Sequence, residues 1–318
     1  MDKPEEDNQL KLLYKNLSGV IVGNKDALLL TLATLLSKGH LLIEDAPGLG
    51  KTTLAKTLAR SMNMDFSRLQ CTPDLTPSDI TGISIFNLEE HQFHFHPGPV
   101  FTNILLADEI NRATPRTQSA LLEAMSEGTV TIDRKTHQLE DPFMVVATQN
   151  PIEFSGTYPL PEAQLDRFLM RISLGYPNED NEVNIISAQQ KGHPLDGLQA
   201  VITGEQFVKF QMLAEKISIN DAMLRYIAKL VRATREHELV RLGSSPRGSL
   251  ALMKAGKSLA LLTGKKFVTP EIIHKLAQPV LGHRLIFRDS SLYELEAQQI
   301  FFKDLLKSVP VPDNPENT

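Results

Sequence analysis

Short apolar runs alternate with helical patterns through the first half of the chain. The runs read as buried strands at 40–43, 66–71, 103–109, 143–148 and 169–172. After the first run, Leu54 and Leu58 lie one turn apart within 52–61, which predicts an amphipathic helix. Apolar spacing also predicts helices at 9–19, 27–36 and 114–126. Strands that alternate with helices are typical of an α/β domain.

Two stretches interrupt this alternation with the period of two that marks a β-hairpin. Residues 80–86 and 92–96 alternate around a polar turn, and they predict a hairpin inserted into a helical connection. Residues 128–139 predict a second hairpin, whose tip is Asp133-Arg134-Lys135. An exposed charged loop at this place could face a central pore, and a solvated turn explains the pattern equally well.

Near residues 175–180 the strand pattern stops and a helical pattern follows. Apolar spacing and capping residues predict helices at 206–217, 221–235, 246–262, 270–281 and 293–308. We therefore divide the chain into an α/β core at 1–195, with hairpin inserts near 80–97 and 128–140, and an all-α domain at 196–318. The tail at 310–318 is rich in proline and asparagine, which predicts disorder.

The composition is that of a globular protein. The chain is 42% apolar and 22% charged, and its lone Cys71 excludes an internal disulfide and fits a reducing compartment. The acidic N-terminus is the opposite of a secretory signal, and the longest apolar stretch is about half a membrane span. We therefore expect a cytoplasmic protein with no membrane span. The net charge of −5 argues against nucleic acid as a partner, although it leaves open a local basic stripe.

A glycine loop joins the first strand to its helix. Gly48 and Gly50 let the backbone turn its N–H groups inward at a helix N-terminus, which favours an anion. Lys51 is placed for the β- and γ-phosphates of a nucleoside triphosphate, and the Thr52 hydroxyl for Mg²⁺. Asp45 replaces the first glycine of the usual pattern, and we expect it to adopt the left-handed backbone of that position. The predicted nucleotide contacts are Pro47, Gly48, Leu49, Gly50, Lys51, Thr52 and Thr53.

Two carboxylates follow the third strand. Asp108 and Glu109 stand at its C-terminal end, where open α/β sheets bind ligands. Asp108 is placed to hold Mg²⁺ through its water shell, and Glu109 to orient and deprotonate the attacking water. An Asp-Glu pair also suits a helix N-cap, but the upstream phosphate loop favours the catalytic interpretation. Asn150, which follows the strand at 143–148, is a candidate for holding the water or the γ-phosphate, although Asn-Pro is also a common turn.

Three further positions have two interpretations each. Arg167 is either a surface ion-pair partner or a finger that reaches a neighbouring subunit's nucleotide. Arg247 lies in the first turn of a predicted helix, where a cation opposes the helix dipole, so it is either a phosphate contact or an exposed arginine. Val22 and Gly23 precede a helix, where they either lie over the adenine or form a plain turn.

Taken together, these residues resemble the MoxR family of AAA+ ATPases over nearly the whole chain. The matching segments are 44–53, 107–112, 147–151, 165–168 and 245–247. The resemblance implies a P-loop domain with a five-stranded parallel sheet in the order 5-1-4-3-2, and a C-terminal helical lid. It also implies that Asn150 is sensor 1, Arg167 the arginine finger and Arg247 sensor 2, and that the hairpins are the helix-2 and pre-sensor-1 inserts. Because the lid of that clade is displaced, Arg247 could act on a neighbour's nucleotide.

Members of this family look like hexameric, chaperone-like motors that mature or activate other proteins, often partners with a von Willebrand factor A domain. The resemblance therefore implies ATP and Mg²⁺ as cofactors, a homo-oligomeric ring and a client protein. A nucleic-acid-dependent AAA+ motor is the alternative, for which Arg134 and Lys135 are a thin basis. A small-molecule kinase is disfavoured because no acceptor pocket is legible, and a nucleotide-binding scaffold because every hydrolytic part is present.

Overall fold

The computed structural model describes residues 3–150, 157–190 and 192–312. Its centre is a five-stranded parallel sheet in the spatial order β2-β5-β8-β1-β9. The strands are β1 (Leu41–Glu44), β2 (Phe66–Gln70), β5 (Ile104–Asp108), β8 (Met144–Gln149) and β9 (Met170–Ile172). If these strands are numbered 1 to 5 along the chain and the sheet is read from β9 to β2, the order is 5-1-4-3-2. The implied sheet is therefore confirmed, with β8 between β1 and β5.

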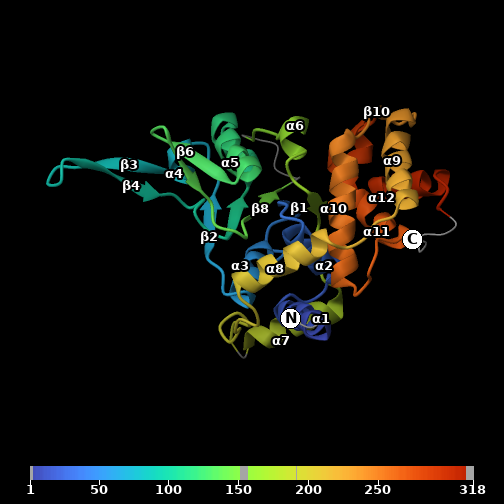
Figure 1. Ribbon diagram of the computed structural model, residues 1–318, viewed down its shortest axis with the longest axis horizontal. Coiled ribbons are helices and arrows are strands. Elements are labelled where there is room, and N and C mark those ends of the chain that lie inside the picture. Colours follow the sequence, from blue (N-terminus) through green and yellow to red (C-terminus); the bar gives the residue numbers. More distant parts are fainter. Residues whose placement is uncertain (1–2, 151–156, 191, 313–318) are drawn as a thin grey trace.

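Helices cover both faces of this sheet (Figure 1). One face carries α1 (Lys3–Val20), α2 (Lys25–Leu36) and α3 (Lys51–Ser61), and the other carries α5 (Pro115–Glu127). Because successive residues of a strand point to opposite faces, neighbours in β8 enter different cores. Val146 packs on the side of α1–α3, and Val145 packs on the side of α5. Burial on both faces explains why the strands read as continuous apolar runs.

Both predicted hairpins are present. The first consists of β3 (Gly82–Asn87) and β4 (Gln92–Pro97), and it projects far from the body of the molecule (Figure 1). Its first strand begins two residues later than predicted, because Thr76 and Asp79 form a capping box that starts the short helix α4 (Pro77–Thr81). The second consists of β6 (Thr129–Ile132) and β7 (Lys135–Gln138), with Asp133 and Arg134 in left-handed backbone at its tip.

The two hairpins contact one another through aromatic rings. Phe95 of β4 stacks on His137 of β7 with 4.3 Å between the ring centroids. Phe101 meets both rings edge-on, at 5.4 Å from Phe95 and 6.2 Å from His137. The far part of the first hairpin exposes two large apolar side chains on either side of its polar turn, since Leu88 is 77% exposed and Phe93 is 71% exposed.

The C-terminal region is helical, and each predicted helix is found within two residues of its expected ends. The helices are α8 (Gly204–Glu215), α9 (Asp221–Glu236), α10 (Pro246–Leu262), α11 (Pro270–Leu281) and α12 (Leu295–Ser308). Asn220 caps α9 as expected, because its side chain accepts a hydrogen bond from the Met223 N–H at 2.9 Å. α10 packs against α2 as well as α8, so the lid and the α/β core share one apolar core.

Two features of this region were not predicted. Within the lid, β10 (Val240–Leu242) pairs antiparallel with β11 (Ile286–Phe287), so the all-α description needs a correction. Strands of two or three residues are too short to show alternation. Before the lid, α7 (Glu179–Gln190) buries no residue and therefore has no apolar stripe to reveal it.

The expectations of a disordered tail and of no membrane span can be compared with the structure only over the described residues. Of the tail that we predict to be disordered, residues 313–318 lie outside them. Over the described ranges, no helix is both long enough and apolar enough to span a membrane.

Candidate functional site

The loop between β1 and α3 has the geometry that a bound phosphate requires. Gly48 and Gly50 both have a φ of 85°, in the left-handed region that favours glycine. Gly50 is the N-cap of α3, so no side chain at this position competes for the N–H groups of the first turn. The predicted order of strand, glycine loop and helix is confirmed.

Asp45 does not adopt the left-handed backbone that we expected, since its φ is not positive. Its buried carboxylate instead accepts hydrogen bonds from Ser173 Oγ at 2.5 Å, from the Leu174 N–H at 2.6 Å and from the Gly175 N–H at 3.3 Å. Its own N–H donates to the Gln149 carbonyl at 3.3 Å, as in a continued strand. Asp45 therefore extends β1 and binds the chain that leaves β9, and the turn of the loop begins further along.

Lys51, the first residue of α3, is folded over the loop. Its Nζ donates to the carbonyl of Asp45 at 2.7 Å and to that of Ala46 at 3.3 Å. Burial lowers the pKa of Lys51, and the carboxylates of Asp45, Asp108 and Glu109 oppose that shift. The ammonium group is thus held close to the loop and in the field of three carboxylates.

The two carboxylates at the end of β5 are positioned by Thr148 of β8. Thr148 Oγ1 donates to Asp108 Oδ1 at 2.6 Å and accepts a hydrogen bond from the Glu109 N–H at 2.9 Å. Glu109 has φ 56° and ψ 52°, a left-handed conformation that is uncommon for a residue other than glycine and is concentrated at functional sites. In a regular strand, neighbouring side chains point to opposite faces. This turn allows both carboxylates to line one cavity.

Three polar residues to which the sequence assigned no role in the site donate hydrogen bonds to the two carboxylates. Arg68 of β2 donates to Asp108 Oδ2 at 2.7 Å. Gln70 Nε2, from the same strand, donates to Glu109 Oε2 at 3.1 Å, and Arg112 donates to the same oxygen at 3.0 Å. Arg68 and Gln70 alternate along β2, so they share a face, but only the pairing of β2 with β5 brings that face beside the carboxylates.

These side chains surround a cavity of about 410 Å³, which we call the phosphate cavity. Its lining residues are Pro47, Gly48, Gly50, Lys51, Thr52, Thr53, Arg68, Gln70, Asp108, Glu109, Thr148 and Asn150. The structure thus brings together most of the predicted contacts from the loop, β5 and β8. The remaining predicted residues do not line this cavity: Val22, Gly23, Leu49, Arg167 and Arg247.

The two predicted arginines make contacts elsewhere within the chain. Arg167 donates to the Leu122 carbonyl at 2.9 Å and to Ser126 Oγ, both in α5. Arg247 at the start of α10 forms an ion pair with Asp166 at 3.3 Å, and its side chain is 73% exposed. An exposed arginine in a weak surface pair is available for other partners.

Val22 and Gly23 lie beside the segment that leads into α7. Gly23 has a φ of 114°, and a Cβ built on it would contact Pro177 and Asn181. The residues are thus near the chain that leaves β9 rather than in the phosphate cavity. Their role toward the adenine stays a prediction.

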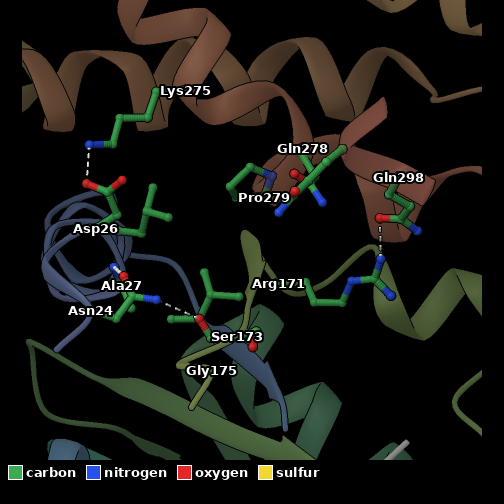
Figure 2. Close-up of a pocket in the computed structure, with 13 residues that line it drawn as sticks. Asn24, Asp26, Ala27, Arg171, Ser173, Gly175, Lys275, Gln278, Pro279 and Gln298 are labelled. Atoms are coloured by element: carbon green, nitrogen blue, oxygen red, sulfur yellow. Dashed lines mark hydrogen bonds and ion pairs between the residues drawn. The ribbon is translucent and has the colours of Figure 1, made fainter. Parts of the chain in front are cut away.

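A second cavity, of about 340 Å³, lies where the core meets the lid (Figure 2). Lys275 of α11 reaches down to Asp26 of α2, with 2.6 Å between Nζ and Oδ1. Arg171 of β9 donates to Gln298 of α12 at 2.8 Å and to Glu44, the last residue of β1, at 3.0 Å. The lid is therefore connected by hydrogen bonds to the strand that leads into the phosphate loop.

A parallel sheet of this order, a glycine loop at the N-terminus of a helix, paired carboxylates on the third strand and a helical lid define the class of AAA+ ATPases. Comparison with known proteins agrees. Residues 40–170 match the model of the ATPase family associated with various cellular activities, and residues 232–301 match the AAA lid domain.

The chain belongs to the MoxR family of AAA+ ATPases. It is 48% identical to the uncharacterized protein YeaC of Bacillus subtilis over 94% of this chain and 93% of that protein. It is 41% identical to Chaperone MoxR1 of Mycobacterium tuberculosis over 92% of this chain and 80% of the relative. A crystal structure of a candidate ATPase from Cytophaga hutchinsonii superposes with a TM-score of 0.89 at 36% identity, covering 97% of this chain and 96% of that one.

Proposed function

We propose that this chain binds ATP with Mg²⁺ in the phosphate cavity and hydrolyses it. One observation carries the proposal: Lys51, Thr52, Asp108, Glu109 and Asn150, from three different elements and their loops, line one cavity at the N-terminus of α3. Backbone N–H groups and an ammonium group suit phosphate oxygens, and a hydroxyl and a carboxylate are the oxygen donors that suit Mg²⁺. The donor set therefore fits both groups.

Each residue has a role that follows from its position. The loop N–H groups and Lys51 bind the β- and γ-phosphates, and the oxygens of Thr52 and Asp108 would hold Mg²⁺. When bound, Mg²⁺ neutralises charge on the phosphate oxygens. Glu109 orients and deprotonates the attacking water, with its carboxylate held by Gln70 and Arg112.

The remaining predicted residues complete the nucleotide site in this proposal. Asn150 positions the water or the γ-phosphate from the end of β8, and Thr53 and Leu49 complete the loop contacts. Val22 and Gly23 lie toward the adenine. The core at 1–195 holds these residues, and the lid at 196–318 contributes Arg247.

We further propose that the protein works as a homo-oligomeric ring, a hexamer, in the cytoplasm. Arg167 lies outside the phosphate cavity of its own chain and Arg247 is largely exposed, so both suit contact with a neighbour's nucleotide. The ring would remodel or activate a client protein, for which proteins with a von Willebrand factor A domain are the first class to test. The relative from Mycobacterium tuberculosis bears the name of a chaperone, which supports this proposal.

The experiment is release of phosphate from ATP by the purified protein, with Mg²⁺ and with a chelator in its place. We expect turnover that requires Mg²⁺ and that rises with protein concentration as rings form, with assembly followed by sedimentation. Adding DNA or RNA to the same assay tests the alternative of a nucleic-acid-dependent motor, because nucleic acid would then stimulate ATP hydrolysis. Absence of turnover at every concentration of assembled protein would refute the proposal.

A further inference from the structure

Arg68 gives the phosphate cavity a second cation besides Lys51. Arg68 contacts one oxygen of the Asp108 carboxylate, and Thr148 contacts the other. The Arg68 guanidinium donates to Asp108 Oδ2 at 2.7 Å and to Gln70 Oε1 at 3.1 Å. Arg68 is in β2, and two strands, β5 and β8, lie between β2 and β1, the strand that leads into the phosphate loop. Arg68 lines the cavity because β2 pairs with β5, and not because it is close to the loop in the sequence.

Both oxygens of Asp108 are engaged within the protein. Oδ1 accepts from Thr148 and Oδ2 accepts from Arg68. Thr148 is 1% exposed and also holds the Glu109 N–H, so it is fixed by the sheet. The side chain of Arg68 is 49% exposed, so it is the partner of Asp108 that has room to move.

Charge decides where this side chain goes when MgATP binds. A divalent cation held by Thr52 and Asp108 repels a guanidinium on the same carboxylate, whereas a terminal phosphate in the same cavity attracts it. The planar guanidinium can donate two hydrogen bonds to phosphate oxygens. We propose that Arg68 exchanges Asp108 for the terminal phosphate when MgATP binds, and that the protein thereby distinguishes ATP from ADP.

This inference rests on the proposed function and makes two separate statements about binding. Loss of the guanidinium weakens binding of a triphosphate but not of a diphosphate, because only the triphosphate offers the terminal group. It also frees Oδ2 of Asp108, so less Mg²⁺ is needed for Mg²⁺-dependent binding of ADP. A charge-assisted hydrogen bond changes an equilibrium by about tenfold or more.

The test is calorimetry with ADP and with the ATP analogue whose β-γ bridge is an imido group, so that no turnover interferes. Arg68→Gln should lower the ratio of the two affinities by about tenfold or more, while Arg68→Lys keeps the charge and part of the ratio. It should also lower the Mg²⁺ concentration that half-saturates ADP binding. Arg232→Gln is the matched control, because Arg232 forms a surface ion pair with Glu236 in the lid and should keep the parent's ratio.

The outcomes are distinguishable. A parent that binds both nucleotides, with an Arg68→Gln variant that keeps the parent's ratio, overturns the exchange and leaves the proposed function standing. A lower Mg²⁺ requirement with an unchanged ratio also overturns it, because Arg68 then only competes with Mg²⁺. A parent that binds neither nucleotide overturns the proposed function, and the exchange with it. Melting curves of each variant establish that it is folded.

Discussion

The carboxylate of Asp45 accepts a hydrogen bond of 2.6 Å from the backbone N–H of Leu174. This contact ties the start of the phosphate loop to the chain that leaves β9, the strand on the other side of β1 from β8. The position at which the usual loop pattern has glycine is thus a connection between two strand ends. In this chain the residue at that position supplies a carboxylate that accepts hydrogen bonds from Ser173 and Leu174, whereas a glycine would supply only a flexible backbone.

Restoring the usual glycine should therefore destabilise the protein. Asp45→Gly leaves the N–H of Leu174 buried without its acceptor, and we expect the free energy of unfolding to fall by about 2–4 kcal/mol. Asp45→Asn keeps an acceptor oxygen without the charge, so its loss should be smaller. Urea denaturation measures both. If Asp45→Gly were as stable as the parent, the carboxylate would not be what holds the loop to β9.

His40 gives a prediction about pH. Its Nδ1 accepts from the Val145 N–H at 3.0 Å and its Nε2 donates to the Met125 carbonyl at 2.9 Å, an arrangement that only the neutral ring can make. Burial lowers the pKa of His40 to about 4. Because the unfolded chain binds this proton near pH 6.5, stability is unaffected at pH 7 and is lost as pH falls from about 6.5 to about 4.

The variant His40→Gln has no imidazole at this position, so comparing it with the parent isolates the contribution of His40 to the pH dependence of stability. The advantage of the parent over His40→Gln in free energy of unfolding should shrink by up to about 3 kcal/mol between pH 7 and pH 4. Other buried histidines, such as His283, titrate in both proteins and cancel in the difference. A difference that stays constant over this pH range would mean that His40 is protonated in the folded protein as easily as in the unfolded chain.

Much of the fold and of the site could be predicted because the signals are local. The glycine loop, the carboxylates after β5 and the hairpins each occupy one short stretch, and the apolar runs fix the strands. Arg68 and Gln70 could not be found in this way, because their relation to Asp108 and Glu109 depends on which strand pairs with which. Gln70 lies opposite Asp108 in the register of β2 and β5, which no local pattern contains.

The errors have physical causes of the same kind. Our expectation for Asp45 assumed that the backbone of a pattern position is set by the loop, whereas distant donors after β9 set it. The pairing of β10 with β11 joins segments more than forty residues apart in the chain and is too short to leave a pattern. Contacts between distant segments decided these cases, and local propensity did not.

Lys51→Ala should weaken nucleotide binding without unfolding the protein. Lys51 contacts only loop carbonyls among the hydrogen bonds described for it, so the core does not depend on it, whereas the phosphates lose a cation. We expect the affinity for MgATP to fall by about tenfold or more in calorimetry. Lys56→Ala in the same helix is the control and should bind like the parent. Tight binding of MgATP by Lys51→Ala would refute the assignment of the phosphate loop.

Arg167 should act across a subunit boundary. We expect Arg167→Ala to bind ATP but to lose about 10³- to 10⁵-fold in turnover, as when arginine fingers are removed. Ser126→Ala removes one contact of Arg167 within its own subunit, together with the bond from the same hydroxyl to the Leu122 carbonyl, and it should keep turnover. Mixed with Glu109→Gln subunits, which retain the finger, Arg167→Ala subunits should regain partial activity. Failure to do so, in mixtures shown by sedimentation to assemble together, would make Arg167 a structural residue.

The paired carboxylates should separate binding from chemistry. Asp108 is placed to hold Mg²⁺, so Asp108→Asn should weaken the part of ATP binding that depends on Mg²⁺. Comparing ATP affinity with Mg²⁺ and with a chelator measures this part. Equal Mg²⁺ dependence in Asp108→Asn and the parent would remove Asp108 from the metal site.

Turnover by Glu109→Gln tests the central claim, that this cavity hydrolyses ATP, most directly. The amide keeps the shape of the side chain and can still bond Arg112 or Gln70, but it cannot take a proton from water. In a single-turnover experiment with MgATP bound, we predict that the variant binds like the parent and that its rate of hydrolysis falls by about 10²- to 10⁴-fold. A rate close to that of the parent would contradict the assignment of Glu109 as the base and, with it, the mechanism proposed for this site.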